Sequence, residues 1–234
     1  MLQALAFLTI GGTGPAPDGR TMRWFPLTGA LIGLVLGGTW WLAEQAFPPL
    51  LAGAIVVTAD LAVTGLLHVD GLADTADGLL PHLDHDGRLA VMADPTTGAY
   101  GVAVVAIVLL VRTVALGARP ADVGLLVGLW CASRSAMALV TLTRPYARPG
   151  GLATSFLGDR VAPTLAVVGI LGGGALATAT DGRAGLAATV ALVIGAAAVV
   201  ALAQRRIGGF TGDVIGALGM VGETGALVVA AAKW

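Results

Sequence analysis

The stretch "LLAGAIVVTADLAVTGLLHVDGLADTADGLL" (residues 50–80) joins an apolar run to three aspartates that lie within eight residues. The apolar run, residues 50–67, is close to the ~20 residues that a membrane-spanning helix needs. Asp70, Asp74 and Asp77 follow it at the spacing i, i+4, i+7, which places them on one narrow stripe of a helix. The stretch therefore predicts a membrane helix that leads into an acidic helix face at the edge of the bilayer.

The composition of the whole chain is typical of a membrane protein. Of its 234 residues, 56% are hydrophobic and 12% are charged, and its mean hydropathy is +0.88. A soluble domain carries about 25% charged residues, so this chain has too little polar surface to face water. The net charge of −1 provides no basic surface for nucleic acid, and the single cysteine, Cys131, excludes an internal disulfide and a Cys-based zinc site. We expect an all-α, polytopic integral membrane helical bundle that forms one catalytic domain over residues 1–234.

Seven segments are long enough and apolar enough to span a bilayer. They are residues 28–46, 50–67, 99–118, 121–142, 162–180, 185–203 and 212–232. The N-terminal residues 1–12 lack a positively charged start and are too short to span. We expect them to lie at the membrane interface rather than to form a cleaved signal peptide.

The charges of the connecting loops predict the orientation in the membrane. The long loops carry eight of the arginines: Arg20, Arg23, Arg88, Arg144, Arg148, Arg160, Arg205 and Arg206. The short turns and the C-terminal end carry three basic residues: Arg119, Arg183 and Lys233. By the positive-inside rule the long loops face the cytoplasm. We expect a multi-pass protein of the bacterial cytoplasmic (inner) membrane with its active site on the cytoplasmic side.

Three carboxylates on one stripe repel one another, and a divalent cation is the simplest compensation at neutral pH. Ligands that are all oxygen favour Mg²⁺, with Mn²⁺ as the alternative, rather than zinc. A solvated helix end would explain Asp70 alone, because acids are stabilised near a helix N-terminus. It would not explain three aspartates on one face beside lipid, so Asp70, Asp74 and Asp77 are candidate metal ligands.

Buried charges within the predicted spans point to further candidates. Arg134 lies inside the fourth span, where a guanidinium must be paired or face a polar cavity, and its planar fork suits phosphate oxygens. Arg144 follows that span, where substrate contact and positive-inside anchoring are equally open. Asp60 lies in the middle of the second span, and pairing with an arginine such as Arg112 and a functional role are equally open.

Two loops add polar groups to this picture. "RRIGGFTGDVIGALG" (residues 205–219) places Thr211 and Asp213 at a glycine-rich helix start, where backbone N–H groups bind anions and where Asp213 is either a metal ligand or a cap. Asp94 precedes Pro95, where a helix would stop. The chain contains no GxSxG, HExxH, Walker A or CxxC motif. An acidic metal site with arginines at a membrane surface suits transfer of a phospho-linked group from a diphosphate donor to an alcohol.

Four motifs occur in one order along almost the whole chain, and together they resemble the cobalamin synthase family, the adenosylcobinamide-GDP ribazoletransferases. They are "HVDGLADTADGLL" (68–80), "VMADPTTGAYG" (91–101), "SRSAMALVTLTRPYAR" (133–148) and "GGFTGDVIGAL" (208–218). Two positions depart from the family pattern, because Ile10 and Ala93 stand where the family usually has basic residues. Any phosphate or anchoring contact of those basic residues is absent in this chain.

The resemblance implies a Mg²⁺-dependent membrane enzyme that transfers the cobinamide-phosphate group of adenosylcobinamide-GDP to α-ribazole, or to its 5′-phosphate, with release of GMP. It implies catalytic roles for Asp70, Asp74, Asp77 and Asp94, of which the first three hold the metal. The implied substrate-binding residues are His68, Arg134, Arg144, Thr211 and Asp213. Besides the lipid bilayer, a second copy of the chain or other cobalamin-assembly enzymes are the partners left open.

Two other functions compete with this interpretation. CDP-alcohol phosphotransferases also place Asp-Gly pairs at a membrane helix end, but their signature needs an Ala-Arg pair after the first Asp-Gly, and Asp70-Gly71 is followed by "LADTADG". A secondary transporter would use Asp60 and Arg134 for ion coupling. Transporters often contain internal repeats, and this sequence shows no convincing one.

Overall fold

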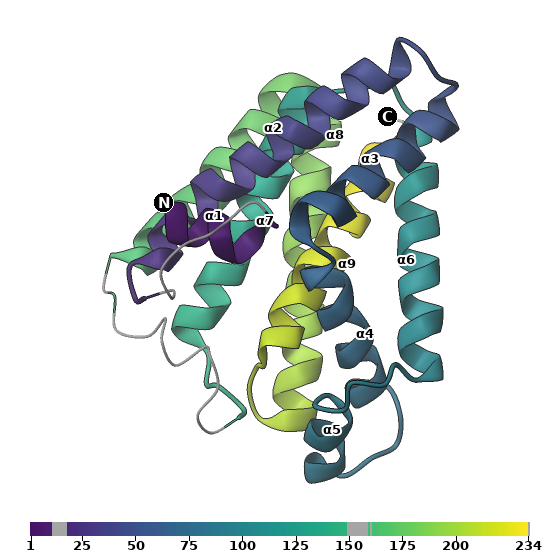
Figure 1. Cartoon of the computed structure of the whole chain (residues 1–234). Coiled ribbons are helices and arrows are strands. Elements are labelled where there is room, and N and C mark those ends of the chain that lie inside the picture. The colour runs from purple at the N-terminus through teal and green to yellow at the C-terminus, as the bar shows by residue number, and fades with distance from the viewer. Residues whose placement is uncertain (11–17, 149–158, 160, 234) are drawn as a thin grey trace.

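The computed structural model describes residues 1–10, 18–148, 159 and 161–233, and in these ranges the chain is helical apart from its connections (Figure 1). The elements are α1 (Leu2–Leu8), the 3₁₀ helix η1 (Thr21–Trp24), α2 (Phe25–Glu44), α3 (Pro49–Thr64), α4 (Leu67–Leu79), α5 (His85–Val91), α6 (Ala99–Gly117), α7 (Val123–Thr143), α8 (Ala162–Ile207) and α9 (Gly212–Ala230). The predicted all-α class is therefore confirmed.

The helices have the length and apolarity of membrane spans. Among the described residues, five segments pass this test by themselves, namely η1 with α2, α6, α7, α8 and α9. The pair α3 and α4 passes it only jointly, with a bend of 92° between the two helices. The chain is thus a multi-pass membrane protein. The predicted span over residues 50–67 extends too far at its C-terminal end, because α3 ends at Thr64, and the predicted acidic helix is the separate helix α4.

Two successive residues in the left-handed region cause the bend between α3 and α4. Gly65, with φ 58°, ends α3, and Leu66, with φ 63°, begins α4. A left-handed residue after a helix stops the α-helical path, and a second one turns the chain again. The backbone N–H of Ile10 donates to the carbonyl of Val63 at 2.9 Å, so the N-terminal segment is bound beside the bend.

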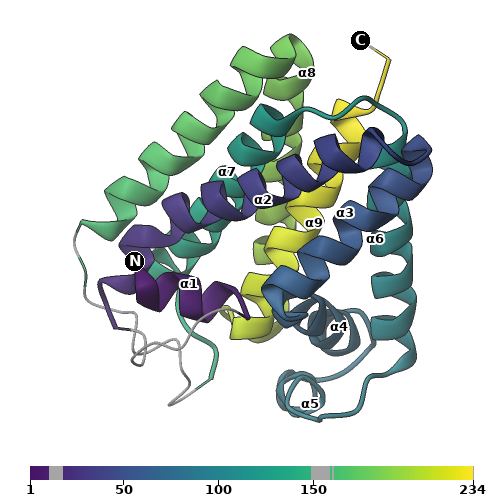
Figure 2. The ribbon, with the colours of Figure 1, turned by 45° about the horizontal axis from the view of Figure 1, so that its top comes forward.

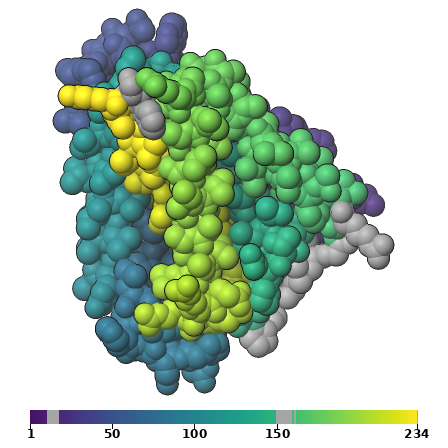
Figure 3. Space-filling model, turned by 180° about the vertical axis from the view of Figure 1, so that it is seen from behind, coloured from purple at the N-terminus to yellow at the C-terminus, as the bar shows by residue number. Residues whose placement is uncertain are grey.

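Helix α8 folds back on itself at Gly182, whose φ of 58° and ψ of −136° interrupt the helix. Gly174 of the first arm lies against Thr189 of the second, and Gly185 lies against the backbone of Ala177. The two arms are therefore antiparallel and closely packed, as rows of small residues allow in membranes. They form the back of the molecule (Figure 3). The predicted spans 162–180 and 185–203 are these two arms.

One end of the molecule gathers the short turns. Arg119 donates two hydrogen bonds to the carboxylate of Asp181, at 2.7 and 2.8 Å, and another to the carbonyl of Ala230 at 3.1 Å. The backbone N–H of Ala121 donates to Glu44 at 2.9 Å. The α2–α3 turn, the bend of α8 and the C-terminus accordingly lie at the same end (Figure 1).

The opposite end carries α1, α4 and α5 (Figure 2). There Arg23 of η1 forms an ion pair with Asp159, close to the start of α8, and this guanidinium lowers the pKa of Asp159 to about 2. Inside the bundle, Gly29 and Gly33 of α2 lie against backbone atoms of Trp130 and Leu126 on α7. These two glycines of α2 therefore serve helix packing. The described parts of the long loops lie at the opposite end from the short turns, as the sequence predicts.

Candidate functional site

Helix α4 carries the acidic stripe, and its three aspartates differ in exposure. Asp70 is exposed, Asp74 is half-buried and Asp77 is buried. The carboxylate of Asp74 experiences the negative charges of Asp70, Asp77 and Asp213 and the positive charge of Arg148. The helical stripe predicted from the spacing is present, and a fourth acid from α9 joins it.

Asp77 holds the start of α6. Its carboxylate accepts hydrogen bonds from the backbone N–H groups of Gly98, at 2.7 Å, and Gly101, at 2.9 Å. These are first-turn donors that have no partner within their own helix, and a carboxylate at this end is also favoured by the helix dipole. Asp77 therefore caps a neighbouring helix, and its position in the stripe is explained without a ligand.

Arg88 of α5 holds the other end of α4. The side chain is buried, and one guanidinium nitrogen donates to the carbonyls of Gly78 at 2.9 Å and Leu79 at 3.0 Å. Carbonyls in the last turn of a helix lack partners within the helix, and a cation there also interacts favourably with the helix dipole. Sequence reasoning counted Arg88 only as a positive loop charge and missed this role, because its partners are backbone atoms.

Two glycines bring α9 close to α4. Gly71 packs against the backbone of Asp213, and Gly216 packs against the backbone of His68. Thr211 caps α9 by accepting from the N–H of Val214 at 3.3 Å and also donates to the Asp213 carboxylate at 3.1 Å. This packing places Asp213 beside the exposed part of the acidic stripe. Asp70, Asp74 and Asp213 are called the acidic face below.

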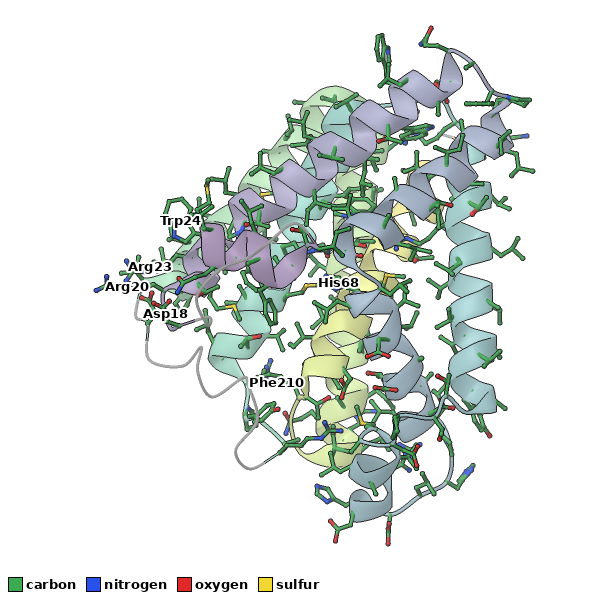
Figure 4. All side chains as sticks on the ribbon, viewed as in Figure 1. Asp18, Arg20, Arg23, Trp24, His68 and Phe210 are labelled. Carbon is green, nitrogen blue, oxygen red and sulfur yellow. The ribbon has the colours of Figure 1, made fainter. Side chains whose placement is uncertain are left out.

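A short backbone pairing brings two of the sequence motifs together. The N–H of Ala147 donates to the carbonyl of Phe210 at 2.8 Å, and the N–H of Phe210 donates to the carbonyl of Pro145 at 3.0 Å. The rings of Tyr146 and Phe210 lie 5.3 Å apart, and Figure 4 shows Phe210 below the start of α4. Residues 145–148, the strap, therefore bind the segment that leads into α9, and the strap ends at the acidic face.

Arg144 directly precedes this strap, and Arg148 is its last residue. The side chain of Arg144 is exposed. The guanidinium of Arg148 lies 3.6 Å from the Asp213 carboxylate and 3.4 Å from the carbonyl of Leu89. Positive charge thus stands directly beside the acidic face.

Arg134 is held away from the acidic face by a buried charge network. Its guanidinium forms an ion pair with Glu223, and both side chains are almost completely buried. Ser133 donates to the same carboxylate at 2.6 Å, and Arg112 binds Glu223 at 2.5 Å and Asp60 at 3.1 Å. The open question about Asp60 and Arg112 is resolved in favour of pairing. Substrate contact by Arg134 is not supported, because its charge is already matched by Glu223.

His68 lies on the other side of α4 from the stripe. Two residues along a helix correspond to a rotation of about 200°, so His68 and Asp70 face different ways. The imidazole is buried, with 4% of the residue exposed, and neither ring nitrogen has a hydrogen-bond partner in the described part of the protein. The imidazole experiences the charges of Arg134 and Glu223. The structure therefore does not bring His68 to the acidic face as a substrate contact.

Asp94 occupies the turn that precedes α6. Its carboxylate accepts from the backbone N–H of Thr96 at 2.8 Å and from the Thr96 hydroxyl at 2.5 Å, and these hydrogen bonds lower the pKa of Asp94. The side chain is exposed at the same end of the molecule as α5. It is therefore an ionised carboxylate on the loop beside α4.

The donor set fits a cation that is shared with a substrate. In the described residues, no group of three or more His, Cys, Asp or Glu side chains is arranged to hold a metal ion by itself. Mg²⁺ normally keeps several waters and is bound through one or two carboxylates together with substrate phosphates. The exposed Asp70 and the half-buried Asp74 and Asp213 carry carboxylate oxygens, the donor type that such a site uses.

Fold and site together define a multi-pass membrane protein with an acidic, arginine-flanked site at one end. A family model described as cobalamin-5-phosphate synthase matches residues 1–231. The chain is similar to proteins named adenosylcobinamide-GDP ribazoletransferase. One from Pseudomonas aeruginosa strain UCBPP-PA14 is 38% identical over 99% of this chain and 97% of the relative. One from Bradyrhizobium diazoefficiens is 34% identical over 97% of this chain and 90% of the relative.

A third relative with that name, from Chlorobaculum tepidum, is 34% identical over 98% of this chain and 92% of the relative. No solved structure matches the chain. The chain belongs to the cobalamin-5-phosphate synthase family. The resemblance drawn from its four motifs is thereby confirmed.

Proposed function

We propose that this protein is a transferase of cobalamin synthesis that acts as an adenosylcobinamide-GDP ribazoletransferase. It transfers the cobinamide-phosphate group of adenosylcobinamide-GDP to a hydroxyl of α-ribazole, or of α-ribazole 5′-phosphate, and releases GMP. The names of its relatives support this activity. The observation that carries the proposal is the meeting of separate motifs at one acidic face, where the strap and α9 join α4.

The cofactor in this proposal is Mg²⁺, or alternatively Mn²⁺, held by Asp70 and Asp74 with Asp213 beside them. When bound, the cation supplies charge neutralisation for the diphosphate and its leaving group. Asp77 contributes indirectly, because its hydrogen bonds to α6 fix the orientation of α4. A metal site of one or two carboxylates is consistent with the absence of a larger preformed cluster in the described residues.

The remaining residues of the site bind and orient the two substrates. Thr211 fixes the carboxylate of Asp213 through the hydrogen bond from its hydroxyl. Arg144 is exposed directly before the strap and attracts the anionic donor. Asp94 provides an ionised carboxylate on the adjoining loop, where it orients the attacking hydroxyl or a second cation.

We further propose that the protein lies in the bacterial cytoplasmic membrane with this site facing the cytoplasm. The eight arginines of the long loops, against three basic residues at the opposite end, support this orientation. Nucleotide-activated donors and GMP are charged and do not cross lipid unaided, so a cytoplasmic site gives direct access to them.

The test is product formation by purified protein in lipid vesicles. Adenosylcobinamide-GDP and α-ribazole are supplied with Mg²⁺, and GMP and the corrinoid product are quantified with and without EDTA. We expect stoichiometric GMP release that EDTA abolishes and excess Mg²⁺ restores. Absence of GMP from this substrate pair would refute the proposed function. Uptake of the corrinoid into sealed vesicles without a covalent product would favour a transporter instead.

A further inference from the structure

Arg148 combines three features that set it apart from the arginines around it. It ends the strap that binds the segment before α9, its side chain is 29% exposed, and it lies beside the acidic face. Its two contacts within the described residues are long, at 3.6 Å to the Asp213 carboxylate and 3.4 Å to the carbonyl of Leu89. A charge-assisted hydrogen bond is normally 2.7–2.9 Å. The guanidinium thus lies at the site, and none of the described residues binds it at a short distance.

The other arginines with described ion pairs or buried hydrogen bonds are already occupied. Arg112 and Arg134 share Glu223 in the buried network. Arg88 is buried against the last carbonyls of α4. Arg23 is paired with Asp159. Among these, only Arg148 pairs with an aspartate of the acidic face and is also accessible from water.

The charge of the acidic face requires such a group. Asp70, Asp74 and Asp213 are three acids on two adjoining helices, and a diphosphate brings further negative charge to the same place. A cation bound by the carboxylates offsets part of this repulsion. A guanidinium offers several N–H donors in one plane and matches two phosphate oxygens simultaneously, which a single point charge does not.

We infer that Arg148 binds the diphosphate of the nucleotide-activated donor and that it exchanges Asp213 for phosphate oxygens when the donor arrives. This inference rests on the proposed function and names the residue that recognises the diphosphate. The exchange would free the Asp213 carboxylate, which with Asp70 and Asp74 would then hold the cation that neutralises the diphosphate.

The experiment measures binding of GDP with Mg²⁺ to the purified full-length protein in lipid nanodiscs by calorimetry. GDP is a probe that carries the diphosphate and does not require turnover. We expect Arg148→Ala to weaken GDP binding by roughly tenfold to a hundredfold, the usual range for loss of a hydrogen-bonded charge. Arg148→Lys should bind GDP with an affinity between those of the wild type and Arg148→Ala, because lysine keeps the charge and loses the planar fork. Arg183→Ala, at the opposite end of the molecule, is the matched control and should bind as the wild type does.

A purely structural role for Arg148 would be neutralisation of Asp213. In that case Asp213→Asn, added to Arg148→Ala, would restore GDP binding, and this result would overturn the inference. We expect the double variant to bind no better than Arg148→Ala. Unfolding temperatures of all variants, measured in the same nanodiscs, show that each protein is folded, and Arg148→Lys serves if the alanine variant is not.

The two proposals fail in different ways. Equal GDP binding by wild type and Arg148→Ala, or no GDP binding by the wild type, would overturn the role of Arg148 whatever the outcome of the GMP-release assay. A wild type that binds GDP through Arg148, but releases no GMP from adenosylcobinamide-GDP and α-ribazole, would refute the proposed function and leave the diphosphate site in place.

Discussion

At the scale of single residues, Asp74 and Asp77 lie on the same stripe and have different tasks. Asp74 is half-buried among acids and close to one arginine, so its carboxylate is free to meet a cation. We predict that Asp74→Asn raises the Mg²⁺ concentration for half-maximal activity by about tenfold or more and leaves the unfolding temperature unchanged within a degree or two. The measurement is GMP release across a Mg²⁺ titration. An unaltered Mg²⁺ response would show that Asp74 is not a ligand.

For Asp77→Asn we expect lower stability and an unchanged Mg²⁺ response. An amide keeps one acceptor and directs an NH₂ group at the other backbone N–H, so one buried hydrogen bond to Gly98 or Gly101 is lost. The loss of a buried partner costs about 1–3 kcal/mol. Thermal unfolding in detergent should therefore shift downwards, and the Mg²⁺ titration of the remaining folded protein should keep its midpoint. A shifted midpoint with unchanged stability would make Asp77 a direct ligand.

Single residues also show how far the sequence leads. The stripe of Asp70, Asp74 and Asp77 was predictable, because helical spacing is a local property. The pairing of Arg134 with Glu223 was not, since the two residues are far apart in the chain and meet only when α7 packs against α9. The acidity of a face can therefore be predicted from spacing, whereas the availability of an arginine depends on which helices become neighbours.

At the scale of elements, α4 is fixed at three points. Asp77 binds it to α6, Arg88 closes its last turn, and the bend at Gly65 and Leu66 sets its direction. The sequence indicated the helix but not the bend, because Gly65 stands inside an apolar run where a glycine in a helix is equally acceptable. Only the left-handed backbone of both residues reveals that the run is interrupted.

The left-handed backbone at the bend can be tested by substitution of Gly65. We predict that Gly65→Ala lowers stability by about 1–2 kcal/mol, because an L-residue is disfavoured at a φ of 58°. A Cβ there would also lie 2.5 Å from Cγ2 of Ile10. Ile10→Ala combined with Gly65→Ala should recover only the part of the lost stability that the clash with Ile10 causes. Unfolding temperatures of the single and double variants separate the two causes, and full recovery would show that the backbone is not strained.

At the scale of the whole molecule, charge is divided between two kinds of site. The network of Asp60, Arg112, Arg134 and Glu223 contains two acids and two arginines, and it links α3, α6, α7 and α9 within the bundle. Its acids and arginines form ion pairs with one another, as charges inside a membrane must. The acidic face has more acids than arginines and is partly exposed. The acidic face therefore has an unbalanced charge and is suited to bind a ligand, whereas the buried network is balanced and holds the helices together.

The same division predicts how the molecule lies in the membrane. The end with α5 carries the acidic face and most of the loop arginines, and the end with the α8 bend carries few basic residues. In a Cys131→Ala background, Asp86→Cys on α5 and Arg183→Cys beside the bend each provide one exposed thiol. We expect a membrane-impermeant maleimide to label Arg183→Cys in intact spheroplasts and to label Asp86→Cys only after the membrane is disrupted. The reverse pattern would place the acidic face outside the cytoplasm, and labelling of both variants in intact spheroplasts would show that the two ends are not separated by the bilayer.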